Sequence, residues 1–299
     1  MYNQITANKR KTVLLLGLFI LVILGIGWVF ETYYNTGYGT LGLAGIFSIV
    51  MALASYYAGD KVALATSGAR RIQKEDNPYL FRIIENLAIT AGLPLPKVHI
   101  ITDPAPNAFA CGRDPEHASI AVTTGLLDQM ENEELEGVLS HELSHIKNYD
   151  IRVMTVVIIC VGIITLLADL FLRGRFLGMG GDRRRENNNA AGIFLILGLV
   201  LIVLSPIFAR LIQFAVSRKR EFLADASGAL LTRYPEGLAR ALEKIAAYER
   251  PLARANHATA HLYLSNPFGS DRKKRSGWTT WFSTHPPIDE RIRLLRTMA

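Results

Sequence analysis

Five consecutive residues, His141-Glu142-Leu143-Ser144-His145, place two imidazoles and a carboxylate at a spacing that suits metal chemistry. An α-helix advances by about 100° per residue, so residues 141, 142 and 145 fall within one arc of about 100° on a helix. The two imidazoles then point at one spot, with the carboxylate beside them. A Zn²⁺ ion needs this arrangement to hold and activate a water molecule. The pattern therefore predicts a metal site on a helix.

A catalytic zinc site has a third protein ligand and an open position. Glu221 is our candidate for the third ligand, because Glu221 and Asp225 share one helical face at the spacing i, i+4. Asp225 would then accept the N–H of a ligand histidine and orient its ring. The alternative for this charged segment is a surface helix that carries ordinary ion pairs.

The predicted site supports a hydrolytic reaction. Three protein ligands leave Zn²⁺ able to lower the pKa of a bound water from about 15.7 toward 7. Glu142 is placed to accept the proton of that water and to deliver it to a leaving amine. We therefore expect hydrolysis of an amide bond.

Two further segments are candidates for work on the substrate. Asn107, Ala108 and Phe109 form a predicted strand whose edge could pair with an extended peptide, although an ordinary half-buried strand has the same pattern. His285 stands before two prolines. It could donate a hydrogen bond to a developing oxyanion, or it could simply end the loop that precedes the last helix.

The composition favours a chain that is partly embedded in a membrane. Hydrophobic residues make up 50% of the 299 residues, and the mean hydropathy is +0.21. The net charge of +7 comes from basic residues that flank apolar runs, so it indicates membrane topology and argues against nucleic acid as a partner. Two cysteines give no disulfide framework, which favours a reducing compartment for the active part.

The first two apolar runs, residues 12–30 and 40–58, are long enough to cross a bilayer as a hairpin. Basic residues precede the first run and follow the second, which predicts that the N-terminus and the segment after residue 60 lie in the cytoplasm. A cleaved signal peptide is the alternative for the first run, but the run is longer than the usual apolar core of such a peptide.

Two later apolar runs, residues 153–172 and 190–216, separate the predicted ligands. The segment between them carries five arginines, whose export would oppose the positive-inside tendency. The pair therefore either spans the membrane or dips into it. If Glu221 is to meet His141 and His145, the pair crosses the membrane twice or not at all.

The remaining segments predict a soluble catalytic unit. Helical patterns cover residues 77–91, 131–149, 217–232, 235–249 and 288–297, and short strands are expected at 98–102, 107–111 and 119–123. We divide the chain into a transmembrane hairpin, a first catalytic part, an apolar helical pair and a second catalytic part. Their ranges are 1–59, 60–152, 153–216 and 217–299. The expected fold class is a mainly α membrane protein with a small β-sheet.

Several motifs together resemble the HtpX family of membrane-integrated zinc metalloproteases. They are the 141–145 pentapeptide, Pro106 to Ala110, Glu221 to Asp225, and Thr284 to Pro287 with Arg291. More distantly, the chain is similar to the type I CAAX prenyl proteases. The resemblance implies a zincin-like domain of the gluzincin type, interrupted by the apolar helical pair.

The resemblance also implies a function. It implies one Zn²⁺ per chain with His141, His145 and Glu221 as ligands and Glu142 as the catalytic residue. The implied activity is endopeptidase action on damaged or misfolded membrane proteins or unfolded polypeptides, in protein quality control and stress response. The implied location is the bacterial plasma membrane, crossed several times, with the site facing the cytoplasm. A prenyl-peptide processing protease and a non-catalytic zinc-binding scaffold in the membrane remain as alternatives.

Overall fold

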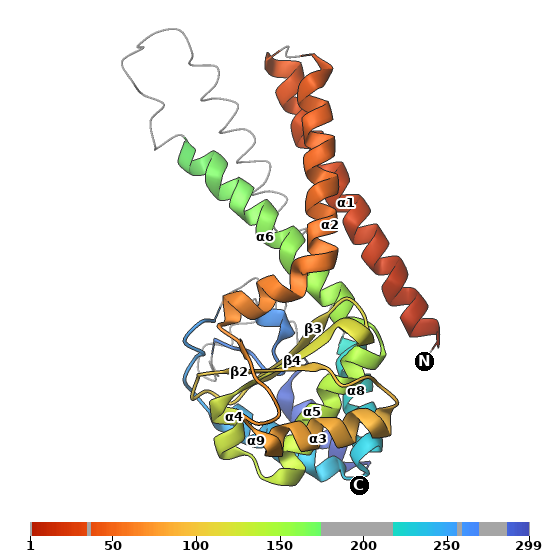
Figure 1. The fold of residues 1–299 in the computed structure, drawn as a ribbon, viewed down its shortest axis with the longest axis vertical. Coiled ribbons are helices and arrows are strands. Elements are labelled where there is room, and N and C mark those ends of the chain that lie inside the picture. The colour runs from red at the N-terminus through yellow and green to blue at the C-terminus, as the bar shows by residue number, and fades with distance from the viewer. Residues whose placement is uncertain (1, 35–36, 175–217, 256–258, 269–285, 299) are drawn as a thin grey trace.

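The computed structural model describes residues 2–34, 37–174, 218–255, 259–268 and 286–298, and three long helices extend from a domain that holds the sheet (Figure 1). The predicted fourth apolar run, residues 190–216, lies outside the described residues, as does His285. The predicted fold class, mainly helical with a small sheet, is confirmed.

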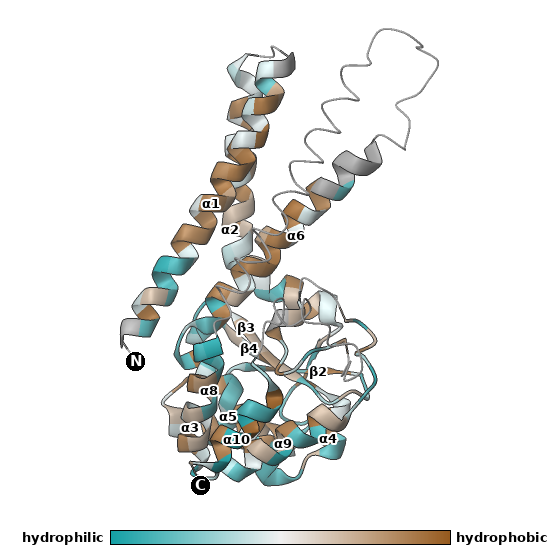
Figure 2. Ribbon diagram, turned by 180° about the vertical axis from the view of Figure 1, so that it is seen from behind, coloured by the Kyte–Doolittle hydropathy of each residue, from teal (hydrophilic) through white to brown (hydrophobic). Residues whose placement is uncertain are grey.

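Three described helices are long and apolar enough to cross a membrane. They are α1 (Tyr2–Tyr34), α2 (Tyr38–Ser67) and α6 (Asp150–Gly174). Hydrophobic residues dominate all three, whereas the domain below them is mixed (Figure 2). The buried share of the most apolar stretch of 18 residues is 17% for both α1 and α2 and 56% for α6. Among the described residues, most of the apolar surface of α1 and α2 is therefore exposed, whereas more than half of the apolar part of α6, Asp150–Leu167, is buried.

Small residues let α2 approach α6 closely. A Cβ atom at Gly59 would lie 2.7 Å from Cγ2 of Thr155, so glycine is needed for this crossing. The hydroxyl of Ser55 donates a hydrogen bond to the carbonyl oxygen of Val156 at 3.3 Å. Close packing of small and hydroxyl residues is typical of helices that associate in membranes.

A four-stranded mixed sheet forms the centre of the domain. Strands β1 (Arg70–Arg71), β2 (Lys97–Ile101), β3 (Ala108–Gly112) and β4 (Ala118–Thr123) lie in the order β1-β2-β4-β3. Only β2 and β4 are parallel, with Val98 opposite Ile120. Every residue of β3 and β4 is buried, because both faces of the sheet are covered.

Different elements cover the two faces of the sheet. One face packs on the soluble helices in a cluster that includes Val98, Ile120 and Leu139. The other face packs on the lower ends of α2 and α6, where Leu64 and Met154 contact Phe109 and its neighbours. Since α2 continues as one helix to Ser67, the predicted division at residue 59 falls inside an unbroken element.

Six helices complete the described part of the domain. They are α3 (Pro78–Ala91), α4 (Thr124–Gln129), α5 (Asn132–Lys147), α8 (Arg218–Thr232), α9 (Pro235–Ala247) and α10 (Ile288–Arg296). The predicted helices and strands agree with these bounds to within two residues at each end. The sequence did not predict β1 and α4, which are short.

The helix that carries the pentapeptide, α5, lies against the backbones of two other helices. A Cβ atom at Gly137 would lie 2.6 Å from the backbone nitrogen of Leu238 in α9. A Cβ atom at Gly228 in α8 would lie 3.1 Å from the backbone nitrogen of His141. Glycine at both positions therefore brings α8 and α9 close to α5 around the metal-binding motif.

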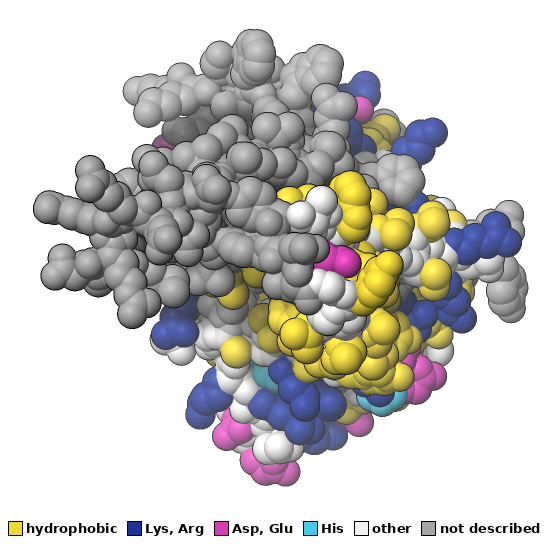
Figure 3. Space-filling model, turned by 90° about the horizontal axis from the view of Figure 1, so that it is seen from above, with side chains coloured by type: hydrophobic (Ala, Val, Ile, Leu, Met, Phe, Trp, Pro, Cys, Tyr) yellow, Lys and Arg dark blue, Asp and Glu magenta, His cyan; other side chains and the backbone are white. Residues whose placement is uncertain are grey.

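A collar of aromatic and basic side chains surrounds the base of the hairpin. Cations lie over tyrosine rings in four pairs: Lys9 on Tyr149, Arg152 on Tyr149, Arg152 on Tyr56 and Arg113 on Tyr57. In Figure 3, seen from above, hydrophobic side chains gather over the hairpin and Lys and Arg side chains lie around them. Tyrosines and basic residues are typical of a membrane–water interface, so we expect the bilayer to end at the level of the collar.

Candidate metal centre

Helices α5 and α8 bring together three side chains that could hold a metal ion. His141, His145 and Glu221 each offer one ligand atom, and these atoms lie within 4.8 Å of one another. The two Nε2 atoms are 3.1 Å apart, and an oxygen of Glu221 lies 3.5 Å from Nε2 of His145. All three residues are buried. The geometry predicted from the helical spacing is therefore present.

Each histidine directs its other nitrogen at a carboxylate. Nδ1 of His141 lies 2.9 Å from Asp225, as the sequence predicted for one of the two histidines, and Nδ1 of His145 lies 3.0 Å from Asp150. Carboxylates only accept hydrogen bonds, so both Nδ1 atoms carry hydrogen and both Nε2 atoms point at the shared space. Two facing Nε2 atoms at this distance need a proton or a cation between them.

The titration of the two histidines fits such a shared position. Burial lowers the pKa of His141, which favours the neutral ring. Burial also acts to lower the pKa of His145, but Asp150 and Glu221 overcome it and raise the pKa to about 9. The raised pKa favours the protonated ring of His145, and a bound cation would have to displace that proton.

Arg291, from α10, fixes Asp225 with two hydrogen bonds. Its Nη2 donates to Oδ1 at 2.6 Å and its Nε donates to Oδ2 at 2.8 Å. Burial acts to raise the pKa of Asp225, but Arg291 and His141 hold it at about 2. Asp225 therefore stays ionised and keeps the ring of His141 in one orientation.

The charge balance around the cluster favours a divalent cation. Among the described residues, four buried carboxylates and two buried guanidinium groups surround the cluster, which leaves an excess of two negative charges when all are ionised and a cation has displaced the proton of His145. The carboxylates belong to Glu142, Asp150, Glu221 and Asp225, and the guanidinium groups to Arg220 and Arg291. Buried charge without a counterion is costly, and one divalent ion would balance this excess.

Glu142 has the properties of a group that exchanges protons. It is buried, and burial raises its pKa to about 7, with His145 opposing this shift and Glu221 adding to it. A pKa near neutrality suits both the acceptance and the release of a proton. Its place between the two histidines on α5 puts it beside the cluster.

The predicted substrate strand is covered at one end in this conformation. The side-chain amide of Asn107 donates to the carbonyl oxygen of Ser265 at 3.2 Å, and the carbonyl oxygen of Ala108 accepts from the backbone nitrogen of Leu264 at 3.0 Å. Phe109 stacks edge-on against Tyr263, with ring centroids 5.1 Å apart. A peptide that paired with this end of β3 would have to replace Leu264, and the substrate role stays a prediction.

Two residues beside the cluster were not predicted from the sequence. Asp150 follows the metal helix and faces His145, and Asn8 of α1 lies against Asp150. The sequence offered one signal for both residues. Each is a polar residue beside a long apolar run, where a polar group is energetically costly and usually has a function.

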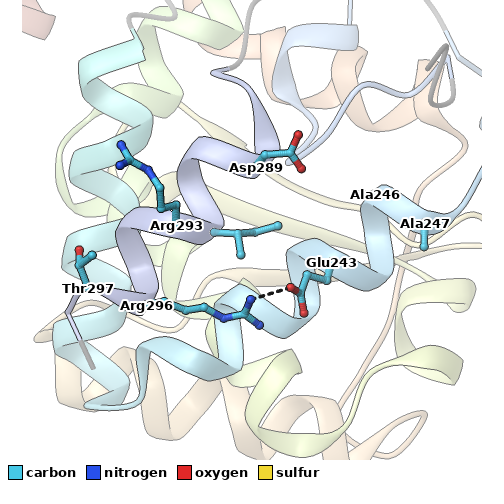
Figure 4. Close-up of a pocket in the computed structure, with 8 residues that line it drawn as sticks. Glu243, Ala246, Ala247, Asp289, Arg293, Arg296 and Thr297 are labelled. Atoms are coloured by element: carbon cyan, nitrogen blue, oxygen red, sulfur yellow. Dashed lines mark ion pairs between the residues drawn. The ribbon is translucent and has the colours of Figure 1, made fainter. Parts of the chain in front are cut away.

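A surface hollow of about 640 Å³ lies elsewhere, between α9 and α10 (Figure 4). An ion pair of 2.9 Å between Arg296 and Glu243 stands at its edge. The hollow shares no residue with the histidine–glutamate cluster, so it is no part of the metal centre. Its lining residues are Glu243, Ala246, Ala247, Asp289, Ile292, Arg293, Arg296 and Thr297.

Two histidines with a glutamate between them, a second glutamate from a neighbouring helix and long apolar helices define a membrane-bound metalloprotease. The chain belongs to peptidase family M48, whose sequence profile matches residues 74–299. The described site and this family membership agree on a hydrolase that acts on proteins.

Relatives match over the full length of the chain. A protease HtpX homolog of Caldanaerobacter subterraneus subsp. tengcongensis is 47% identical over 299 residues, which cover 100% of this chain and 98% of that protein. Homologs carrying the same name from Tropheryma whipplei and Lactobacillus acidophilus are 46% and 42% identical, over 98% and 100% of their lengths.

The fold is also found among solved structures. The crystal structure of S. mikatae Ste24p superposes with a TM-score of 0.51 at 18% sequence identity, covering 99% of this chain and 67% of that chain. At this identity the likeness concerns the fold alone.

Proposed function

We propose that this protein is a zinc endopeptidase that hydrolyses peptide bonds of damaged or misfolded membrane proteins at the cytoplasmic face of a bacterial plasma membrane. One observation carries the proposal: His141, His145 and Glu221 converge within 4.8 Å. The names of the relatives, protease HtpX homolog, support the choice of activity.

His141, His145 and Glu221 are the proposed ligands of one zinc ion per chain. Two imidazole nitrogens and a carboxylate oxygen form a donor set that zinc accepts and that leaves a position open. When bound, the ion supplies Lewis acidity, which makes water more acidic and polarises a carbonyl group. Asp225 and Asp150 orient the two histidines toward it.

Glu142 is the proposed general base and acid. Its carboxylate accepts a proton as the oxygen of water bonds to the scissile carbonyl carbon, and it returns a proton to the amine nitrogen as the C–N bond breaks. Pairing of the substrate backbone with Asn107 to Phe109 and a hydrogen bond from His285 to the oxyanion remain parts of the proposal. The buried position of Glu142 keeps bulk water from competing for this proton.

Substitution of Glu142 tests the activity directly. We expect Glu142→Gln to retain one zinc per chain and to lose about 10²- to 10⁴-fold in the rate of peptide cleavage. Glu221→Gln should lose both zinc and cleavage, because a ligand is removed. Glu133→Gln, an exposed position on the same helix, is the matched control and should behave like the unsubstituted protein.

Zinc content and cleavage are measured on the same purified protein in detergent or lipid. Undiminished cleavage by Glu142→Gln, free of contaminating protease, would overturn the assignment and favour a zinc-binding scaffold. Zinc retained by Glu221→Gln at full stoichiometry would remove this residue from the ligand set.

Two substrates offered together test the substrate class. We expect an unfolded membrane protein to be cleaved in preference to a short prenylated peptide of the CAAX type. A preference for the prenylated peptide would favour the alternative function in peptide processing.

A further inference from the structure

The first membrane helix makes a direct polar contact with the surroundings of the metal centre. Asn8 lies in α1 and its side chain is 3% exposed. Its Nδ2 donates a hydrogen bond to Oδ1 of Asp150 at 2.7 Å and another to the carbonyl oxygen of Asn148 at 2.8 Å. Both contacts are to acceptors, so they use both hydrogens of the amide.

Asp150 carries this contact onward to a predicted zinc ligand. Its Oδ2 lies 3.0 Å from Nδ1 of His145, while its Oδ1 accepts from Asn8 and lies 2.9 Å from Nε of Arg220. Three donors from three helices therefore fix the plane of this carboxylate. The carboxylate in turn fixes the rotation of the imidazole ring and the direction of its Nε2.

The second contact of Asn8, with the carbonyl oxygen of Asn148, is at the C-terminal end of α5. Asn148 caps the C-terminal end of α5, directly after Lys147, and the carbonyl groups at the end of a helix have no partner within the helix. The next residue, Tyr149, has φ of 61°, so the chain turns sharply before α6 begins at Asp150. Asn8 bridges both sides of this turn, which keeps Asp150 at a fixed place relative to His145.

We propose that Asn8 is a positioning residue of the metal centre, acting through Asp150 on His145, so that α1 completes the catalytic site as well as anchoring it. This inference rests on the proposed zinc site. Because the contact joins residues that are more than 130 positions apart, it exists only when α1 is packed against the domain. Metal binding and the seating of the first membrane helix are therefore coupled.

Metal affinity is the first readout of the test. The full-length protein in lipid nanodiscs is titrated with a chromophoric zinc chelator, and the visible spectrum of the Co²⁺-loaded protein reports ligand geometry. Asn8→Ala should raise the zinc Kd by about threefold to tenfold and change the Co²⁺ spectrum. Loss of a direct partner of a ligand histidine weakens metal sites by about 10- to 100-fold, and Asn8 acts one step further out, through Asp150. Asn8→Gln, which keeps the amide, should restore most of the affinity.

Gln4→Ala is the matched control, because Gln4 is an exposed amide one turn earlier on α1. A double-mutant cycle with Asp150→Asn identifies the route. If Asn8 acts through Asp150, Asn8→Ala should change the zinc Kd less than twofold in the Asp150→Asn background. Equal effects of Asn8→Ala in both backgrounds would contradict this route.

The proposal is overturned if Asn8→Ala binds zinc within twofold of the unsubstituted protein with an unchanged Co²⁺ spectrum. It is equally overturned if Asn8→Ala and the milder Asn8→Ser both fail to fold, because the contact would then serve folding. Failure of the proposed function has a different signature, in which the unsubstituted protein itself binds no zinc.

Discussion

At the scale of single residues, each of the two proposed ligand histidines is oriented by its own carboxylate. His141 is held by Asp225, and Asp225 is held in turn by Arg291. His145 is held by Asp150, which receives donors from other helices. The two carboxylates, Asp225 and Asp150, therefore orient the two histidines from opposite ends of the motif.

Arg291→Ala tests the contact that holds Asp225. The substitution leaves the carboxylate of Asp225 buried without its counterion, and loss of one partner of a buried pair costs about 3–5 kcal/mol in the free energy of unfolding. Arg291→Lys keeps the charge but not the planar fork, so we expect an intermediate loss. Unfolding by heat in detergent, followed by circular dichroism, measures both.

Arg293→Ala provides the comparison, because Arg293 lies on the same helix and is exposed. Its free energy of unfolding should stay within about 0.5 kcal/mol of the original value. Equal stability of Arg291→Ala and Arg293→Ala would show that the buried pair contributes nothing to the fold.

The sequence predicted the parts of the site that depend on helical spacing. His141 with His145, and Glu221 with Asp225, each lie on one helix, so a repeat of 3.6 residues places them together. Asp150 reaches His145 only through the left-handed turn at Tyr149, and Asn8 comes from a distant helix. Neither contact follows from a regular spacing of residues, so the sequence pattern could not predict it.

At the scale of elements, α5 packs closely against α8 and α9 because a glycine lies at each of the two contact points. Gly137 of α5 meets the backbone of α9, and Gly228 of α8 meets the backbone of α5 near His141. The strands cover the remaining side through their buried residues. Rigid contacts of this kind hold the metal-binding motif without relying on a loop.

Gly137→Ala tests this packing. The added Cβ atom would lie 2.6 Å from the backbone nitrogen of Leu238, so α9 has to shift, and we expect a loss of about 1–3 kcal/mol in the free energy of unfolding. Gly162→Ala in α6 is the control, because no atom of the described residues lies within 4 Å of its Cβ position. Thermal unfolding of both proteins gives the comparison, and equal midpoints would refute the close contact.

Sequence patterns located the longer helices and the strands but not the arrangement of the sheet. Strands β2 and β4 are neighbours although β3 lies between them in the chain. Pairing of this kind depends on contacts distant in sequence, which local periodicity does not report. The continuous burial of β3 and β4 likewise follows from covers on both faces of the sheet.

At the scale of the whole molecule, the two membrane helices that form the hairpin return the chain to the side from which it started. The N-terminal end of α1 and the C-terminal end of α2 both lie toward the catalytic domain, and the turn between them is at the far end (Figure 1). The basic residues near both domain-side ends agree with a cytoplasmic position for them.

Cysteine labelling in intact cells tests this orientation. Tyr38→Cys places a thiol at the turn, where the side chain is 85% exposed, and we expect it to react with a membrane-impermeant maleimide. Glu75→Cys, exposed on the catalytic domain, should react only after lysis. Native Cys111 and Cys160 are buried and give a low background. Labelling of Glu75→Cys in intact cells would reverse the proposed orientation.

The length of α2 sets the distance between the membrane and the catalytic site. Thirty residues of α-helix rise about 45 Å, whereas the hydrocarbon core of a bilayer is about 30 Å thick, so the last turns of α2 extend beyond the core, where the helix bends and packs on the sheet (Figure 1). Because these turns pack on the sheet, the catalytic site keeps a fixed distance from the lipid. The position of the cleaved bond in a substrate would then depend first on its distance from the membrane surface, and only second on a preference for particular side chains.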